Sequence, residues 1–458
     1  MKLRRLTPIL TVVGLVIIAA AGASAQSPLP VLAPSNVLLP NYTAQAPGLT
    51  AGLEGGAAVA RGDDALATFY NPAGLSRVKE SSLIASGGAM QWVHVTPNAF
   101  PTNVASVGML PVQLGFLWRE PFDYANWSMA VTFTTENNWD HALSAELAGG
   151  TPTQPERYAY SATSKFLKRV ASVGAGYSPD EKLRIGGTAD LVLTQLESAQ
   201  SINDRLIGTN AAPYALVASY NHTRFMHIRL SAGAQYDVGE HVKIGGTFRT
   251  PGIMIANDGT AGFDATANTG GVAKDWSYYD EHPDMTLKLP FEFTGGAAYV
   301  TDRGAIEGDI RITQGNGIYD YFVPSKPLTT ITDTGGGKVT SVDSTFPTVQ
   351  VDSTNVVDVM FGGRYRFAEK GKLTVHAGFA TANSPVGDTD GVFKKVNLTR
   401  LTGGISGSTQ HLTFAGGFSW QSGTSPQYPV FTSQVGQAVN TTIDVSGFAF
   451  VYSVGVRF

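Results

Sequence analysis

The side chains of this chain that are suited to binding an acidic ligand are cations at alternate positions of strand-like runs. Arg184 alternates with apolar residues in the run 182–200, and Lys243 and Arg249 do so in the run 241–260. Successive side chains of a β-strand point to opposite faces, so these cations share one face. A guanidinium or ammonium group there can bind a carboxylate. The candidate carboxylate partners are Arg184, Lys243, Arg249, Arg311, Arg364 and Arg366.

Most of these cations are expected to be structural. The same strand faces carry acids, and we predict that ion pairs with Asp190, Glu307 and Asp309 occupy most of the pool. Any carboxylate of a ligand would then be bound by a minority of the six. The sequence does not single out which one.

Other chemistry has less support in the sequence. The chain has no cysteine, which excludes disulfides, thiolate metal ligands and cysteine nucleophiles. Its 8 histidines include no His-x₃-His pair and no cluster with carboxylates, so neither a metal nor another cofactor is expected. With 32 Lys+Arg against 36 Asp+Glu, the chain is mildly acidic, which argues against nucleic acid as a partner.

A second signal lies in Glu54–Val78, which we call the plug segment. It is rich in glycine and alanine and too short to bury a core of its own, so it is expected to pack inside something else. Pro72 fixes φ and Gly74 tolerates positive φ, which suits a tight turn in a crowded space. The residues assigned to this packing are Asp63, Asp64, Phe69, Tyr70, Asn71, Pro72, Ala73, Gly74 and Leu75.

The charged residues of the plug segment have two interpretations. Asp63 and Asp64 either cap a short helix that begins at Ala65 or pair with basic side chains around the segment, and pairing is slightly favoured. Arg61 and Arg77 are expected to anchor the segment to surrounding acids. The large apolar residues of the segment are expected to pack it in place rather than to contact a ligand.

The first 25 residues have the features of a secretory signal peptide. Lys2, Arg4 and Arg5 form a basic start, Ile9–Ala21 is almost wholly apolar, and Ala23-Ser24-Ala25 is a small-x-small cleavage site. The apolar run is shorter than the roughly 20 residues of a membrane-spanning helix. The rest of the chain has no apolar run of that length either, so an exported protein without a membrane helix is expected.

From residue 81 onward the sequence alternates with a period of two. In the last run Phe448, Phe450 and Tyr452 share one face, while Ser453 and Arg457 lie on the other. In a soluble sandwich the apolar face would point into a core. Because the chain carries an export signal, the apolar face is assigned to lipid and the mixed face to a lumen, as in a transmembrane β-barrel.

The alternating runs number fourteen, and a closed single-chain barrel of the bacterial outer membrane requires an even number. Long polar loops are expected at 137–156, 201–214, 261–283, 321–348 and 423–441, with short turns between them on the periplasmic side together with both termini. The runs are 81–95, 104–118, 126–136, 157–177, 182–200, 215–237, 241–260, 284–300, 304–320, 349–367, 371–383, 397–408, 409–422 and 442–458.

Several of these runs exceed the 9–11 residues that cross the hydrocarbon layer, so they are expected to project outside and form a vestibule. Six aromatic residues lie near the expected strand tips. Interfacial anchoring is favoured over ligand contact for them. They are Trp276, Tyr278, Tyr279, Tyr319, Tyr321 and Phe322.

The signal peptide, the Asn-Pro-Ala-Gly turn and about fourteen strands ending in Phe458 together resemble the FadL-type family of outer-membrane transporters for long-chain fatty acids and aromatic hydrocarbons. The resemblance covers essentially the whole mature chain. Gly55–Leu75 is similar to the hatch of that family, and Ala377–Val386 is similar to its strand-to-loop passage near the C-terminal end. Phe458 matches the aromatic membrane-insertion signal that many such barrels share. The chain then divides into a signal peptide (1–25), an extension and hatch (26–80) and a barrel (81–458).

The resemblance implies a lumen blocked by the hatch, an external groove and an interior pocket for hydrophobic substrates, and sideways release through a gap beside a kinked strand. Release into the bilayer spares the substrate rehydration, which costs about 0.8 kcal/mol per CH₂. The implied partners are a fatty acid or aromatic hydrocarbon, outer-membrane lipid and lipopolysaccharide, and the barrel assembly machinery.

Two other functions stay open at the level of the sequence. A general hydrophilic porin would lack the plug segment and fold a constriction loop inward, so Glu54–Val78 discriminates against it. An outer-membrane lipase or protease would need a Ser–His or Asp–His constellation at the rim. His141, His222 and His282 are the histidines placed for such a role, and no partnering motif accompanies them.

Overall fold

The computed structural model describes residues 41, 46–48, 50–97, 104–121, 124–151, 154–206, 214–269, 272–334, 339–367, 373–388, 390, 392–432 and 437–458. The expected signal peptide, 1–25, and the extension 26–40 lie outside the described residues. The described part is nearly all β, with three short helical turns near its start. Among the described residues, no helix is long and apolar enough to cross a membrane.

Fourteen strands form a closed antiparallel ring, which confirms the predicted barrel. The ring closes where β1 (Ser82–Pro97) pairs with β21 (Gln437–Arg457), from Ser82 opposite Arg457 to Pro97 opposite Ile443. Its order is β1, β2 (Val104–Arg119), β3 (Trp127–Thr151), β4 (Gln154–Tyr177), β5 (Leu183–Leu206), β6 (Tyr214–Asp237), β7 (Val242–Arg249), β11 (Glu292–Val300), β12 (Gly304–Thr313), β17 (Val356–Arg366), β18 (Leu373–Ala382), β19 (Asn397–Ser408), β20 (Leu412–Thr432) and β21.

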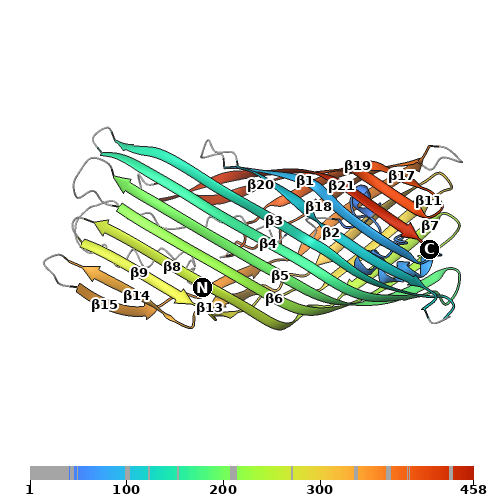
Figure 1. Ribbon diagram of the computed structural model, residues 1–458, viewed down its shortest axis with the longest axis horizontal. Helices are drawn as coiled ribbons and strands as arrows, with labels where there is room; N and C mark the ends of the chain where they lie inside the picture. Colours follow the sequence, from blue (N-terminus) through green and yellow to red (C-terminus); the bar gives the residue numbers. More distant parts are fainter. Residues whose placement is uncertain are drawn as a thin grey trace, which may run out of the picture.

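Beyond the ring, part of the wall continues as a longer sheet. The strand after β6 is split at 250–252. Its first part, β7, pairs with Ser231–Asp237 of β6, and its second part, β8 (Ile253–Thr269), pairs with Tyr214–Ile228 of β6. The outer sheet then runs through β9 (Val272–Asp280), β14 (Pro327–Asp333) and β15 (Val339–Thr345). Figure 1 shows these strands at the end of the molecule opposite the C-terminus.

A small third group of strands connects the ring to the outer sheet. It consists of β10 (Asp284–Met285), β13 (Gly317–Val323) and β16 (Val349–Ser353), which pair only with one another among the described strands. The same chain segments therefore leave the ring, pass through this small sheet and enter the outer sheet. Buried Met285, Tyr321 and Phe322 show that the small sheet packs against the interior.

The predicted long loops are largely wrong. The segments 137–156 and 423–441 are mainly strand, because β3 and β4 reach Thr151 and Gln154, and β20 and β21 reach Thr432 and Gln437. The other three predicted loops also contain strands, β5 to Leu206, β8 with β9, and β14 with β15. Outside the hydrocarbon layer both faces of a strand meet water or protein, so the apolar alternation that marks a spanning strand is lost while backbone pairing goes on.

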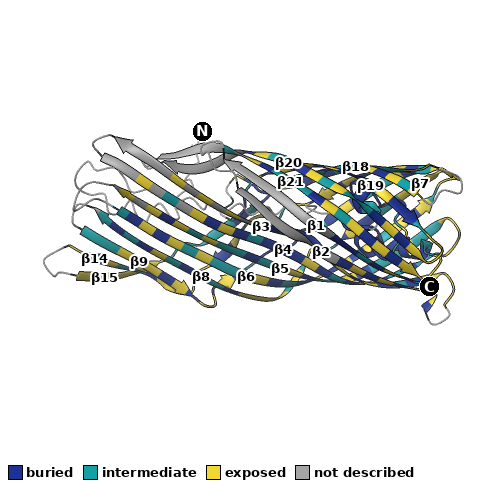
Figure 2. Ribbon diagram, turned by 45° about the horizontal axis from the view of Figure 1, so that its top comes forward, coloured by how far each residue is buried: buried dark blue, intermediate teal, exposed yellow. Residues whose placement is uncertain are grey.

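The assignment of the apolar face to the outside is correct. Phe450, Tyr452 and Val454 of β21 are 49, 52 and 43% exposed, whereas Ser453 is 3% exposed. The same alternation of buried and exposed residues runs along the other ring strands (Figure 2). The ring therefore presents an apolar outer surface and a polar, largely filled interior.

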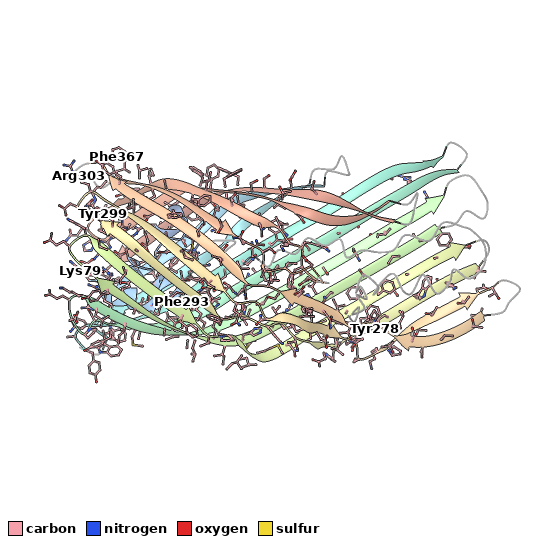
Figure 3. All side chains as sticks on the ribbon, turned by 180° about the vertical axis from the view of Figure 1, so that it is seen from behind. Lys79, Tyr278, Phe293, Tyr299, Arg303 and Phe367 are labelled. Atoms are coloured by element: carbon pink, nitrogen blue, oxygen red, sulfur yellow. The ribbon has the colours of Figure 1, made fainter. Side chains whose placement is uncertain are left out.

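The interpretation of the aromatic residues as an interfacial belt is wrong for five of the six. Tyr279 is 53% exposed, but the others have exposed fractions of 8% or less and belong to an internal apolar cluster. An aromatic belt does lie at the opposite end, where Tyr299 and Phe367 are 48 and 67% exposed beside the short turn at Arg303 (Figure 3). Tyr319, Tyr321 and Phe322 are buried because they lie on β13 of the small sheet, whereas Trp276 and Tyr278 lie on the buried face of β9.

We expect Ile310→Lys to lower the free energy of unfolding by about 2–4 kcal/mol, because Ile310 lies near the middle of β12 and is 53% exposed on its outer face. Val342→Lys is the control: Val342 is 61% exposed on β15, beyond the ring, and a change within about 0.5 kcal/mol is expected there. Urea unfolding of the protein in lipid vesicles measures both. Equal effects would contradict the placement of the ring in the hydrocarbon layer.

Candidate functional site

The plug segment lies against the inner wall of the ring. It contains the end of a 3₁₀ turn, Ala51–Glu54, then α2 (Ala67–Tyr70), and a second 3₁₀ turn, Pro72–Arg77, and most of its residues are buried. Figure 1 shows these short turns inside the barrel, near the end that carries the C-terminus. The segment has too few apolar residues for a core of its own, and the wall supplies its surroundings.

Asn71 ties the plug segment to two strands of the wall. Its Oδ1 accepts a hydrogen bond from the backbone N–H of Ala73 (3.1 Å), which caps the turn that Pro72 begins. Its Nδ2 donates to the backbone oxygens of Val59 (2.9 Å), Ala234 (2.9 Å) and Gly246 (3.2 Å). One fully buried amide therefore joins two parts of the plug segment with β6 and β7.

Glycines on the inner face of the wall allow the plug backbone to come this close. A Cβ at Gly186 would lie 2.6 Å from Ala73 N, and one at Gly176 would lie 2.9 Å from Ser76 N. No side chain fits at such distances from a backbone atom. The glycines whose added Cβ would meet plug or Leu53 atoms in this way are Gly115, Gly174, Gly176, Gly186, Gly233, Gly245, Gly362, Gly378, Gly404 and Gly417.

Ion pairs anchor the plug segment at several points. Arg61 pairs with Glu54 and, through Nε, with Oε2 of Glu307 (2.5 Å) on β12. Glu54 Oε1 also lies 2.6 Å from Nδ1 of His376. Burial raises the pKa of Glu54, but the hydrogen bond with His376 and the charge of Arg61 outweigh it, so that this pKa is lowered from its ordinary value. Glu54 therefore stays ionised inside the lumen.

The wall acids also bind the plug backbone directly. Asp309 Oδ2 accepts hydrogen bonds from the N–H groups of Ala58 (2.9 Å) and Val59 (3.2 Å), and Glu307 Oε1 accepts one from Ala60 N–H (2.6 Å). These carboxylates accept hydrogen bonds from backbone N–H groups that have no partner within a helix or strand. The arrangement replaces the secondary structure that the segment lacks.

The remaining plug residues behave in different ways. Arg77 donates to Asp237 (2.6 Å), as expected for an anchor. Asp64 accepts a hydrogen bond from Leu66 N–H (2.8 Å) in the turn before α2, while Asp63 is exposed. The predicted cap of a helix at Ala65 is wrong, because α2 begins at Ala67 and its N-cap, Leu66, has no side-chain cap. Phe69 is covered by the guanidinium of Arg249, 4.7 Å from its ring centre. Tyr70 donates to Pro47 O, and Leu75 packs fully buried against the wall.

A layer of buried charges follows beyond the plug. On the inner face of β4, β5 and β6, farther along than the glycines that meet the plug, lie Lys168, Asp190 and Arg229. Glu136 lies 2.5 Å from Lys168 and 2.9 Å from Arg229, and Asp190 lies 3.1 Å from Arg229. Buried charges are tolerated when they are paired in this manner. Two acids and two bases of the layer pair with one another.

The six candidate carboxylate partners are spread over the lumen. Arg249 and Arg311 both approach Glu292, at 2.7 and 3.6 Å. Arg184 and Lys243 both lie 3.1 Å from Asp237 at the turn end. Arg364 is half-buried near Glu54, and Arg366 is exposed outside the lumen. The structure does not bring the six together.

The predicted acidic partners are also different from those observed. Asp190 pairs with Arg229, Glu307 pairs with Arg61, and Asp309 binds plug backbone, so the predicted pairing of these acids with the six candidates is wrong. Four further charged residues of the lumen are not identified from the sequence, namely Glu136, Lys168, Arg229 and Glu292. Alternation in β4 and β6 places Lys168 and Arg229 on the inner face, but Glu136 lies in a bulge between Thr135 and Asn137, which breaks the pattern.

Above the charged layer lies a cavity of about 40 Å³. Its apolar lining includes Phe166, Leu287 and Phe393, and its polar lining includes Asn41 and Thr194. Several of these apolar residues also belong to the largest internal cluster, which continues upward through Trp139, Phe225, Trp276, Tyr278, Tyr319, Tyr321 and Phe322. Apolar side chains therefore pack continuously from the outer sheet to the lining of the cavity.

The wall beside this level is incomplete. β2 and β3 pair only from Arg119 opposite Ser128 to Leu114 opposite Phe133. Beyond Phe133, β3 still pairs with β4 as far as Thr151. On the other side, β2 still pairs with β1 as far as Val104. Over this stretch β2 and β3 do not pair with each other. The bulge at Glu136 and the cavity-lining Asn137 follow directly after this point in β3.

His376 has both a serine and an acid as hydrogen-bond partners, with Nδ1 2.6 Å from Glu54 and Nε2 2.8 Å from Ser406 Oγ, but it is buried beside the plug segment and not at the rim. The three rim candidates have other surroundings. His222 Nδ1 lies 3.2 Å from Glu197, His282 is exposed, and the side chain of His141 lies outside the described residues. In the part that the structure describes, no group of three or more histidines and acids is placed to hold a metal ion.

Comparison with known proteins supports the fold. Neither protein-family models nor curated proteins match the chain. Among solved structures, the Pseudomonas putida toluene transporter TodX shares 14% identity over 91% of this chain and 100% of its own, with a TM-score of 0.57. A Pseudomonas aeruginosa FadL homologue shares 11% identity over 92 and 99%, with a TM-score of 0.59. The Ralstonia pickettii toluene transporter TbuX shares 15% over 90 and 99%, with a TM-score of 0.54. The chain has the fold of these barrels over nearly its whole length.

We expect Gly245→Ala to displace the plug segment, because its Cβ would lie 2.8 Å from Ala60 Cα on the inner face of β7. Gly246→Ala is the matched control, since the only neighbouring atom that its Cβ meets is Thr294 O at 3.8 Å. In planar bilayers the first variant is expected to conduct small ions more than the wild type, and the second to behave like the wild type. Equal conductance of the two variants would contradict the close packing described here.

Proposed function

We propose that this chain is a FadL-type channel of the bacterial outer membrane for the passive uptake of hydrophobic small molecules, and not an enzyme. Long-chain fatty acids and aromatic hydrocarbons are the substrate classes. The observation that carries the proposal is the order of parts within one closed ring: a plug of polar contacts at one end, and beyond it a cavity with an apolar cluster that reaches the outer sheet. We infer that this cluster is an apolar path for the substrate. The toluene transporters named above share this fold, which supports the proposal.

The apolar path fits a hydrophobic substrate because its walls replace water. Apolar surface gains roughly 25 cal/mol per Å² when it leaves water, so a substrate gains free energy as it enters the cluster around Phe225 and Tyr321. The small sheet β10–β13–β16 supplies much of this cluster. A hydrophilic solute would gain nothing there.

Sideways release is supported by the missing pairing between β2 and β3. The pairing ends at Leu114 and Phe133, and the cavity-lining Asn137 follows four residues later in β3. A substrate that passes between the strands here enters the hydrocarbon layer without crossing the charged layer or the plug. With the short turns and both termini on the periplasmic side, this exit lies within the outer membrane.

The plug argues against the hydrophilic porin. A porin needs a continuous water-filled lumen, whereas here Asn71, Arg61 and Asp309 fix backbone across the lumen. A porin-like passage would require the whole set of contacts to break.

We expect cells that rely on this channel to take up toluene but not its sugar-bearing analogue, benzyl glucoside, because a glucoside cannot leave sideways into lipid. Uptake of the two labelled compounds is measured in a strain without other channels of this type, with and without the gene. Glucose uptake is the control for a porin. Gain of glucose or glucoside permeability without toluene uptake would contradict the proposed function.

A further inference from the structure

The cavity above the charged layer has an unusual lining for a hydrocarbon site. Asn41, Thr194 and Ser353 line it, and Asn41 Oδ1, Thr194 Oγ1 and Ser353 Oγ have no hydrogen-bond partner within the described part of the chain. Their residues are 0, 2 and 8% exposed. Three polar atoms from the N-terminal region, β5 and β16 therefore meet at one place, out of reach of bulk water.

The orientation of the Asn41 amide shows what kind of group it can bind. Its Nδ2 donates to the backbone oxygens of Ala382 (2.6 Å) and Val396 (2.8 Å), which uses both N–H bonds. A flipped amide would point its oxygen at two carbonyl oxygens, so Oδ1 is the atom left toward the cavity. An oxygen accepts only, and its partner must therefore be a donor. The hydroxyls of Thr194 and Ser353 can both donate and accept.

A plain hydrocarbon would leave these atoms without partners. A buried polar atom without a hydrogen bond costs about 1–3 kcal/mol. A ligand hydroxyl can donate to Asn41 Oδ1 and accept from a threonine or serine hydroxyl. The volume agrees with this role: a dry cavity that holds benzene measures about 150 Å³, so about 40 Å³ suits a small polar group such as a hydroxyl and not a whole ring.

The charges around the cavity favour a neutral ligand over a carboxylate. Lys168 and Lys288 line it together with Asp352 and Asp390, two cations against two acids. Lys168 is already paired with Glu136 at 2.5 Å. A ligand carboxylate would bring an unbalanced negative charge into this set.

We propose that the preferred substrate is a neutral hydrophobic compound with a hydroxyl group, such as a phenol or a fatty alcohol, and that Asn41, Thr194 and Ser353 bind this hydroxyl. The inference rests on the proposed function and narrows its substrate class. It predicts a preference for such a compound over a plain hydrocarbon and over a fatty-acid anion among the substrates of the channel.

The test compares p-cresol, p-xylene and p-toluate, which differ only in a hydroxyl, a methyl or a carboxylate on the same ring. Binding to the purified full chain in lipid nanodiscs is measured by calorimetry, with empty nanodiscs as the correction for partition into lipid. We expect p-cresol to bind about tenfold more tightly than p-xylene, with p-toluate the weakest. Thr194→Val and Ser353→Ala should each reduce the cresol-to-xylene ratio at least about threefold.

Thr188→Val is the matched control. Thr188 also has a buried hydroxyl without a partner on the inner face of β5, but it does not line the cavity, so its variant should keep the wild-type ratio. Equal binding of p-cresol and p-xylene by the wild type would overturn the inference, as would tighter binding of p-toluate or a loss of preference in Thr188→Val. In each of these cases binding of a hydrophobic ring still supports the channel. Failure to bind any of the three, together with no cellular toluene uptake, would overturn the proposed function itself.

Discussion

The close contact between the backbone of the plug segment and the inner wall of the barrel sets the conditions for the rest of the structure. Where Pro72, Ala73 and Val59 touch the wall, a strand must present glycine, since any Cβ would overlap them. Backbone donors in a segment with so little helix must also find acceptors, and Asp309 and Glu307 provide them. The close contact therefore requires both kinds of residue on the inner face: glycines that leave room for the plug backbone, and acids that accept hydrogen bonds from its N–H groups.

That requirement divides the lumen into two halves with different chemistry. The half toward the turns holds the plug and charges that are paired among themselves, as with Glu136, Lys168 and Arg229. The half toward the outer sheet holds the apolar cluster and the cavity. Because paired buried charges are costly to separate, the polar half is a barrier to hydrophobic and hydrophilic solutes alike. The opening between β2 and β3 lies where the two halves meet.

The sequence predicts the barrel well because lipid imposes a strict period of two on each ring strand, as in Phe450, Tyr452 and Val454. It predicts the outer strands poorly, because β8, β9, β14 and β15 lie beyond the ring, where lipid does not impose that period. Arg61 and Arg77 could be predicted as anchors, because they are the two basic residues of a segment that must pack inside a lumen lined with acids. The Glu136 network could not, since a bulge changes which face a residue takes, and neither could the meeting of Asn41, Thr194 and Ser353, which are far apart in the chain.

The most direct measurement is the identity of the compound that the barrel retains when it is extracted from native membranes in a polymer disc, without detergent. Mass spectrometry of the bound material gives that identity. The account predicts a hydrophobic compound, retained by the wild type and depleted in Thr194→Val relative to Thr188→Val. Retention of sugars or other hydrophilic solutes, with no hydrophobic compound above the level of the surrounding lipid, would contradict it.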